Sequence, residues 1–131
     1  MPEISIIIRS KNEEQWIKHC IRSLKIQSIQ NFEIILVDNV STDKTIELAR
    51  SEDPSIKIVS VERYLPGNAL NEGAKVSTGK ILVFLSAHCI PYDRTWLEEL
   101  IKPLGKNNVH ATYGRQIPAT FSTDKDKRDL F

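Results

Sequence analysis

The sequence predicts an α/β fold, with a mostly parallel sheet and helices on both faces. Short apolar runs, typical of buried strands, alternate with stretches that repeat apolar residues at helical spacing. Several of the apolar runs end directly in polar residues, as strands do at the ligand-binding edge of open α/β sheets. Alternation of this kind implies parallel strands joined by right-handed crossovers.

The first half of the chain supplies two strands and two helices. Residues 4–8 form the first apolar run, and Asn12 with Gln15 is a capping signal for the helix that follows. The apolar stripe of that helix consists of Trp16, Ile17, Cys20, Ile21 and Leu24. Residues 32–37 are predicted to form the second strand, and a second helix is predicted over about 44–51.

The second half continues the alternation. Residues 56–61 predict a third strand, and a helix rich in small side chains follows over 66–77. Residues 80–85 predict a fourth strand, which is apolar on both faces and is therefore expected at the centre of the sheet. A helical stripe follows over 96–104, strained near its end by a proline, and 109–117 predicts a last strand.

Length and composition predict one globular domain with a buried core. The chain has 131 residues, of which 40% are hydrophobic and 27% charged. The formal net charge of +1 leaves no basic excess for phosphate neutralisation, so we expect no nucleic-acid partner. No apolar run approaches the ~20 residues that span a bilayer, and no signal peptide is expected. We therefore expect a cytoplasmic protein, with peripheral attachment at the inner membrane face left open.

Polar residues follow the first two strands directly. Asp38 ends the second strand and precedes a helix-start cluster at 41–43, and residues 9–14 follow the first strand. Because parallel strands end at a common edge, we expect these residues to border one crevice. From position alone, Asp38 is either a ligand-binding carboxylate or one that braces a loop or caps a helix. No GxGxxG follows the first strand, and residues 73–80 match a Walker loop only faintly.

Four ordered motifs together indicate one family of enzymes. They are residues 6–14, IIIRSKNEE; residues 34–45, IILVDNVSTDKT; Gly67 with residues 69–73; and residues 79–85. These motifs resemble those of the inverting family 2 glycosyltransferases, which have the GT-A fold. In that order they look like the family's opening strand and loop, its second-strand motif (a valine-aspartate pair followed by Ser-Thr-Asp), its small-residue helix, and the strand before its metal motif. The resemblance covers nearly the whole chain and implies a Rossmann-like GT-A sheet.

The resemblance implies an enzyme of polysaccharide biosynthesis. Such an enzyme transfers a sugar, with inversion, from a UDP or dTDP donor to a glycan or lipid-linked acceptor. Residues 1–121 would form a nucleotide-sugar-binding half-domain, and the polar tail 122–131 would begin the acceptor-binding half. The catalytic base of this family lies in that second half, so we assign none in this chain and expect it beyond Phe131. The chain by itself is expected to bind nucleotide but to transfer sugar poorly or not at all.

The resemblance also implies which residues bind the donor. They come from the strand-end loops, the small-residue helix and the predicted last strand: Ser10, Lys11, Asn12, Glu13, Asp38, Asn71 and Arg115. Asp38 would accept the imide N–H of uracil or thymine, and Lys11 would face the diphosphate. Helix capping explains Ser10 and Asn12 equally well. Helix packing remains an alternative role for Asn71, and a surface salt bridge remains one for Arg115.

One motif departs from the family pattern. Members usually end the fourth strand with Asp-x-Asp, which binds a divalent metal, whereas this chain has Ser86-Ala87-His88. The expected cofactor is therefore Mn²⁺ or Mg²⁺ held at His88, although losing both carboxylates weakens Mg²⁺ and an imidazole suits Mn²⁺ better. Two other roles of His88 stay open: contact of its protonated ring with the diphosphate, and hydrogen bonding within the crevice.

Two other classes of protein fit parts of the pattern. Loss of Asp-x-Asp would also suit a degenerate, non-catalytic module that binds nucleotide or a partner protein. A response-regulator receiver alternates strands and helices and places a phospho-accepting aspartate at a strand end. It uses its third strand for that aspartate and a lysine after its last strand. Here Asp38 ends the second strand, and Arg115 stands near the end of the predicted last one.

Overall fold

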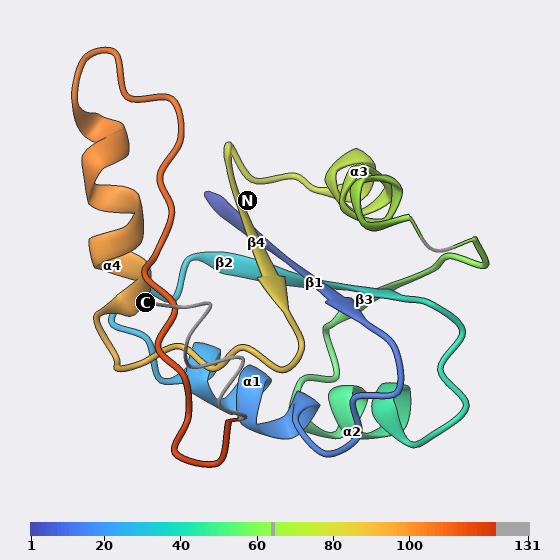
Figure 1. The fold of residues 1–131 in the computed structure, drawn as a ribbon. Helices are drawn as coiled ribbons and strands as arrows, with labels where there is room; N and C mark the ends of the chain where they lie inside the picture. The colour runs from blue at the N-terminus through green and yellow to red at the C-terminus, as the bar shows by residue number, and fades with distance from the viewer. Residues whose placement is uncertain (64, 123–131) are drawn as a thin grey trace. The chain divides into compact units, whose positions relative to one another are not determined.

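A computed structural model describes residues 1–63 and 65–122 of the chain, and its strands and helices alternate as predicted (Figure 1). The elements are β1 (Ile4–Ser10), α1 (Ile17–Lys25), β2 (Phe32–Asp38), α2 (Thr45–Glu52), β3 (Lys57–Ser60), α3 (Pro66–Val76), β4 (Ile81–Ser86), α4 (Trp96–Ile101) and the 3-10 helix η1 (Lys102–Gly105). Two compact units make up the chain, residues 1–98 and the residues from 99 onward. The sheet and its helices α1, α2 and α3 belong to the first.

The four strands form one parallel sheet in the order β3-β2-β1-β4, which confirms the predicted fold class. The register pairs Ser10 of β1 with Asp38 of β2 on one side, and Arg9 of β1 with Ser86 of β4 on the other. Three neighbouring strands of the sheet, β2, β1 and β4, therefore end at the same edge. The polar residues that follow them are brought to that edge by the strand pairing itself.

The prediction that the fourth strand is central is wrong within the described residues, because β4 lies at the edge of the sheet. Apolar side chains on both faces of a strand predict that both faces are covered; they do not predict a neighbour on each side. Even that coverage is incomplete, since Leu82 and Phe84 are 38% and 48% exposed. The central strands are β1 and β2.

Helices cover both faces of the sheet, as predicted: α1 and α2 lie on one face and α3 on the other (Figure 1). The predicted stripe of α1 is buried from Ile17 to Leu24. Small side chains let α3 approach β1 and β2 closely. A Cβ atom on Gly73 would lie 2.4 Å from Cγ2 of Ile7 and 2.9 Å from Cγ2 of Val37.

The predicted cap of the first helix is wrong. α1 begins at Ile17, and no side chain caps it. Asn12 instead has a left-handed backbone (φ 51°), which asparagine tolerates better than most residues. Its Oδ1 accepts a hydrogen bond from the backbone N–H of Thr42 at 2.8 Å. Asn12 therefore ties the loop after β1 to the loop after β2.

The region after β4 differs from the prediction at its end. The predicted helix over 96–104 is confirmed: it consists of α4, which ends at Ile101, and of η1, which contains Pro103. Residues 109–117 have no regular secondary structure, so the predicted last strand is wrong. A strand needs a neighbour for its backbone, and in this segment Thr112 Oγ1 instead donates to the carbonyl of Leu100 at 2.7 Å. Most of the predicted polar tail, 123–131, lies outside the described residues, so the boundary at 121 stays a prediction.

Glu33 connects β2 to three other segments. Its Oε1 accepts hydrogen bonds from Ser5 Oγ at 2.6 Å and from the Thr78 N–H at 2.7 Å, and its Oε2 lies 2.7 Å from Lys57 Nζ. Burial alone would raise the pKa of Glu33, but these bonds lower it from its ordinary value of 4.5 to about 2. A carboxylate whose pKa falls on folding stabilises the protein above its unfolded pKa. That contribution is lost as the pH falls toward the folded pKa.

Glu33→Gln should therefore destabilise the protein at pH 7. The gap between the free energies of unfolding of the variant and the wild type should narrow as the pH falls from about 5 to about 2. Urea unfolding across this range measures the gap. Glu72→Gln is the matched control, because Glu72 pairs with Lys75 on the helix surface. A gap of constant size over the whole range would contradict the lowered pKa of Glu33.

Candidate functional site

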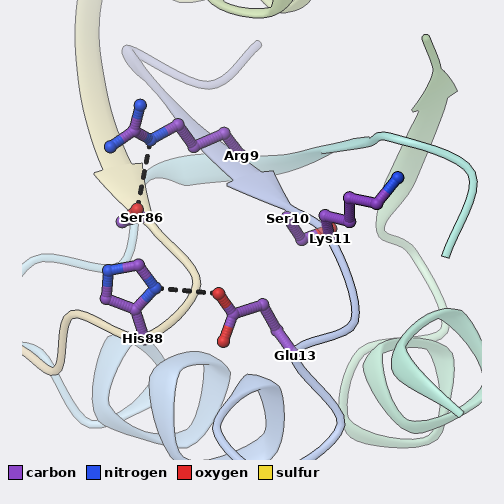
Figure 2. Close-up of a pocket in the computed structure, with 6 residues that line it drawn as sticks. All are labelled: Arg9, Ser10, Lys11, Glu13, Ser86 and His88. Atoms are coloured by element: carbon purple, nitrogen blue, oxygen red, sulfur yellow. Dashed lines mark hydrogen bonds and ion pairs between the residues drawn. The ribbon is translucent and has the colours of Figure 1, made fainter. Parts of the chain in front are cut away.

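The carboxyl ends of β1 and β4 border a pocket of about 150 Å³ (Figure 2). Its lining residues are Arg9, Ser10, Lys11, Glu13, Ser86 and His88. All of them stand at the ends of the two strands or in the loops that follow directly. The pocket thus lies at the edge of the sheet where ligands bind in open α/β folds.

Arg9 and Ser86 form one wall of the pocket. They are register partners on β1 and β4, and Arg9 Nε donates to Ser86 Oγ at 3.1 Å (Figure 2). The serine hydroxyl accepts this hydrogen bond, which orients the guanidinium group at the pocket wall.

His88 and Glu13 form the opposite wall. His88 Nδ1 lies 2.8 Å from Glu13 Oε1, with the histidine side chain 54% exposed and the glutamate side chain 18% exposed. An ionised carboxylate only accepts hydrogen bonds, so Nδ1 carries the proton of this contact. The other ring nitrogen, Nε2, lies on the side of the ring away from Glu13 (Figure 2).

Asp38 is the last residue of β2 and is fully buried. Its Oδ1 accepts hydrogen bonds from Ser10 Oγ and Ser41 Oγ, both at 2.6 Å, and its Oδ2 accepts one from the Ser41 N–H at 2.8 Å. The carboxylate therefore braces the ends of β1 and β2 and the turn after β2. In this arrangement it performs the loop-bracing role that the sequence left open.

The pocket brings together only part of the predicted site. Of the predicted residues, Ser10, Lys11, Glu13 and His88 line it. The Lys11 ammonium points away from His88 (Figure 2), and its Nζ lies 3.4 Å from the carbonyl oxygen of Asn39. The pocket lining does not include Asn12, Asp38 or Asn71. Asn71 is exposed on α3, and Arg115 belongs to the separate unit from 99 onward, in its irregular segment.

Arg9 was expected to border the crevice as part of residues 9–14 but was assigned no ligand-binding role, and Ser86 was predicted only as a lost carboxylate. A signal for Arg9 was present, because it is the only charged residue in the run 4–10 and stands at its carboxyl end. The contact between Arg9 and Ser86 depends on β4 pairing with β1, which the order of elements along the chain does not specify.

No group of three or more His, Cys, Asp or Glu side chains that could hold a metal ion occurs among residues 1–63 and 65–122. Beside His88 lies the carboxylate of Glu13, which is hydrogen-bonded to Nδ1 of the ring. The position of the first carboxylate of Asp-x-Asp carries the hydroxyl of Ser86, bound to Arg9. These donors do not match the all-oxygen surroundings that Mg²⁺ prefers.

The fold and the pocket together define a Rossmann-like α/β domain with a polar site at its strand ends. The family model described as "Glycosyl transferase family 2" matches residues 5–131, and the chain belongs to this family. Membership confirms the resemblance in the motifs and excludes the response-regulator receiver. Within the described part of the chain, no helix is long and apolar enough to cross a membrane.

Three similar proteins illustrate this membership. Glycosyltransferase AglE of Haloferax volcanii is 30% identical over 120 residues, which cover 87% of this chain and 39% of AglE. The mannosyltransferase PcManGT of Pyrobaculum calidifontis, solved with GDP-Man and Mn²⁺, superposes with a TM-score of 0.74 at 27% identity. That match covers 82% of this chain and 34% of the mannosyltransferase.

The third is glucosyl-3-phosphoglycerate synthase from Mycobacterium tuberculosis, solved with Mn²⁺, UDP and glucosyl-3-phosphoglycerate. It has a TM-score of 0.68 at 27% identity, over 79% of this chain and 39% of that one. This chain therefore spans less than half the length of each of the three proteins. Two of them contain Mn²⁺, so divalent metal occurs within structures of this fold.

Proposed function

We propose that this chain is the donor-binding part of a glycosyltransferase that uses a nucleoside-diphosphate sugar. The observation that carries the proposal is the set of residues that line the strand-end pocket, where the cationic side chains of Arg9 and Lys11 accompany the carboxylate of Glu13. A cationic pocket at this edge of the sheet suits the diphosphate of a donor. Support comes from the two similar structures, which contain GDP-Man and UDP.

The nucleoside would lie beside the pocket, over the loops after β1 and β2. Residues proposed to contact the donor remain Ser10, Lys11, Asn12, Glu13, Asp38, Asn71 and Arg115, now joined by Arg9. Sugars attached to UDP or dTDP are the preferred donors, because uracil and thymine present an imide N–H to a carboxylate. Asp38 would accept that N–H through Oδ2 once Ser41 moves aside, since the carboxylate is buried while Ser41 is bound to it.

The proposed reaction inverts the anomeric centre by direct displacement. An acceptor hydroxyl on a glycan or lipid-linked acceptor attacks C1 of the sugar while a general base removes its proton. That base would belong to the acceptor-binding half of the longer protein, in the cytoplasm or at the inner membrane face. Positive charge at Arg9 and Lys11 would stabilise the departing diphosphate. A divalent metal, if bound at His88, would supply the same stabilisation.

A degenerate module that binds nucleotide without catalysis is the second candidate. The observation that favours it is the loss of both carboxylates at 86 and 88, together with the lack of a metal-binding group among the described residues. The two candidates differ in turnover. Full-length protein that binds a donor but never transfers or hydrolyses its sugar would favour the module.

Calorimetric titration with nucleotides tests the proposal. UDP and dTDP should bind with dissociation constants of about 1 μM to 1 mM, the usual range for substrates. ADP and CDP should bind at least about tenfold more weakly, because their bases lack the imide N–H and leave a buried acceptor unpaired. Binding of neither UDP nor dTDP at millimolar concentration would contradict donor binding and favour a module for a protein partner.

A further inference from the structure

The carboxylate of Asp38 is enclosed by hydrogen bonds, one of which a nucleotide base would have to replace. Its Oδ1 accepts from Ser10 Oγ and Ser41 Oγ, and its Oδ2 accepts from the backbone N–H of Ser41 at 2.8 Å. Asp38 has no exposed surface. A base that donates its imide N–H to Oδ2 therefore needs the backbone of the turn after β2 to move. The conformation of that turn decides how readily a base reaches Asp38.

Val40, in the middle of this turn, has a strained backbone. Among residues 1–63 and 65–122, the non-glycine residues with positive φ are Asn12, Val40 and Asn108. Asparagine tolerates the left-handed region, because its short polar side chain can hydrogen-bond locally, whereas a β-branched residue there is a steric outlier. Val40 has φ 48° and is 50% exposed, so packing of its side chain contributes little to holding this conformation.

Hydrogen bonds on both sides of Val40 impose its conformation instead. Before it, the Asn39 N–H donates to the carbonyl oxygen of Ser10 at 2.9 Å and holds the chain against β1. After it, the Ser41 N–H is held by the carboxylate of Asp38. A strained residue persists where surrounding contacts over-determine its backbone. Breaking the bond from the Ser41 N–H would therefore let Val40 leave the left-handed region.

Building on the proposed function, we propose that residues 39–41 form a strained gate at Asp38, in which Val40 is the positioning residue. In the closed form, which the structure shows, the Ser41 N–H occupies Oδ2 and Val40 is left-handed. In the open form Val40 has an ordinary negative φ, and Oδ2 accepts the imide N–H of uracil or thymine. The bonds to Oδ1 remain and brace the loops. Strain in the closed form alone narrows the free-energy gap between the forms and raises the fraction of protein that can bind.

Val40→Asn in the full-length protein tests the gate, because asparagine tolerates the left-handed region and so favours the closed form. UDP binding, measured by calorimetry, should weaken about fivefold. The urea concentration at the midpoint of unfolding should rise, because the closed form of the variant is no longer strained. The factor lost in UDP affinity should match the factor gained in the folding equilibrium constant, since both measure the same strain. Higher stability with unchanged UDP affinity would overturn the gate.

Two variants control for the other effects of replacing a valine. Val40→Thr is the conservative exchange: it keeps the β-branch and therefore the strain, so its UDP affinity and stability should stay near those of the wild type. Val76→Asn makes the same exchange as Val40→Asn at the end of α3, where the valine is 42% exposed, and it should leave UDP affinity unchanged. A loss of affinity in Val40→Thr as large as in Val40→Asn would contradict an effect of strain.

The choice of nucleotide separates the gate from a general disturbance of the site. CDP has no imide N–H to donate to Oδ2, so its affinity should change less than about twofold in Val40→Asn. Equal losses for UDP and CDP would overturn the gate while leaving donor binding intact. So would a structure of the UDP complex in which the Ser41 N–H still binds Oδ2 of Asp38. Binding of neither UDP nor uridine by the wild type would overturn the proposed function as well, so the two failures are distinguished.

Discussion

Replacing Gly79 by alanine should destabilise the protein by about 3 kcal/mol, an amount typical of severe overpacking against a buried backbone. A Cβ atom at this position would lie 2.6 Å from the carbonyl carbon of Ile4 and 2.6 Å from the backbone nitrogen of Ser5. Both are main-chain atoms at the start of the central strand β1, and they cannot move aside as a side-chain tip can. Urea unfolding at pH 7 measures the change.

Gly67→Ala is the control for this prediction. Gly67 lies in the first turn of α3, and a Cβ atom there would meet nothing within 4 Å. Alanine is also the better helix former, so the variant should be unchanged or more stable by up to ~1 kcal/mol. Equal stability of the Gly67 and Gly79 variants would mean that the chain before β4 does not pass as close to β1 as the structure places it.

Exchanging Asp38 for asparagine should reduce the preference for UDP over CDP by about tenfold or more, because the amide no longer repels the N3 acceptor of cytosine. A carboxylate can accept the imide N–H of uracil, whereas an amide can either accept from uracil or donate to cytosine. If Asp38 only braces the loops, both nucleotides should lose affinity in parallel. The ratio of the two dissociation constants therefore separates base contact from bracing.

Ser41→Ala is the matched control for Asp38→Asn. It removes the 2.6 Å hydrogen bond from Ser41 Oγ but leaves the carboxylate in place. This variant should keep the preference for UDP over CDP, and it should bind both slightly more weakly because the turn after β2 is less well held. Loss of the preference in Ser41→Ala would contradict direct recognition of the base by Asp38.

The elements that the sequence predicted correctly are those whose signal is local. The apolar run 34–37 and the stripe of α1 depend on the spacing of side chains along the chain, and both are buried as predicted. The small side chains of α3 likewise indicated close packing, which Gly73 makes against Ile7. The motif around Asp38 then identified the family, because its order of residues is specific.

The errors concern contacts between segments distant in the sequence. Asn12 looks like a cap because capping is the commonest local role of asparagine, but a partner 30 residues later, Thr42, binds its side chain. The segment 109–117 has the composition of a strand, yet a strand exists only when another backbone pairs with it. The exposure of Leu82 and Phe84 on β4 could not be predicted either, since it depends on how far α3 extends over the sheet.

The sequence by itself determined the α/β class, the family and the replacement of Asp-x-Asp, because these depend on the identity and order of residues. Tertiary structure alone decided which side chains surround the replaced positions. The parallel pairing of β1 with β4 places Arg9 beside Ser86, and the loop after β1 brings Glu13 to His88. Charge acts through space over a few ångströms, and the chain separates these partners by more than 70 residues.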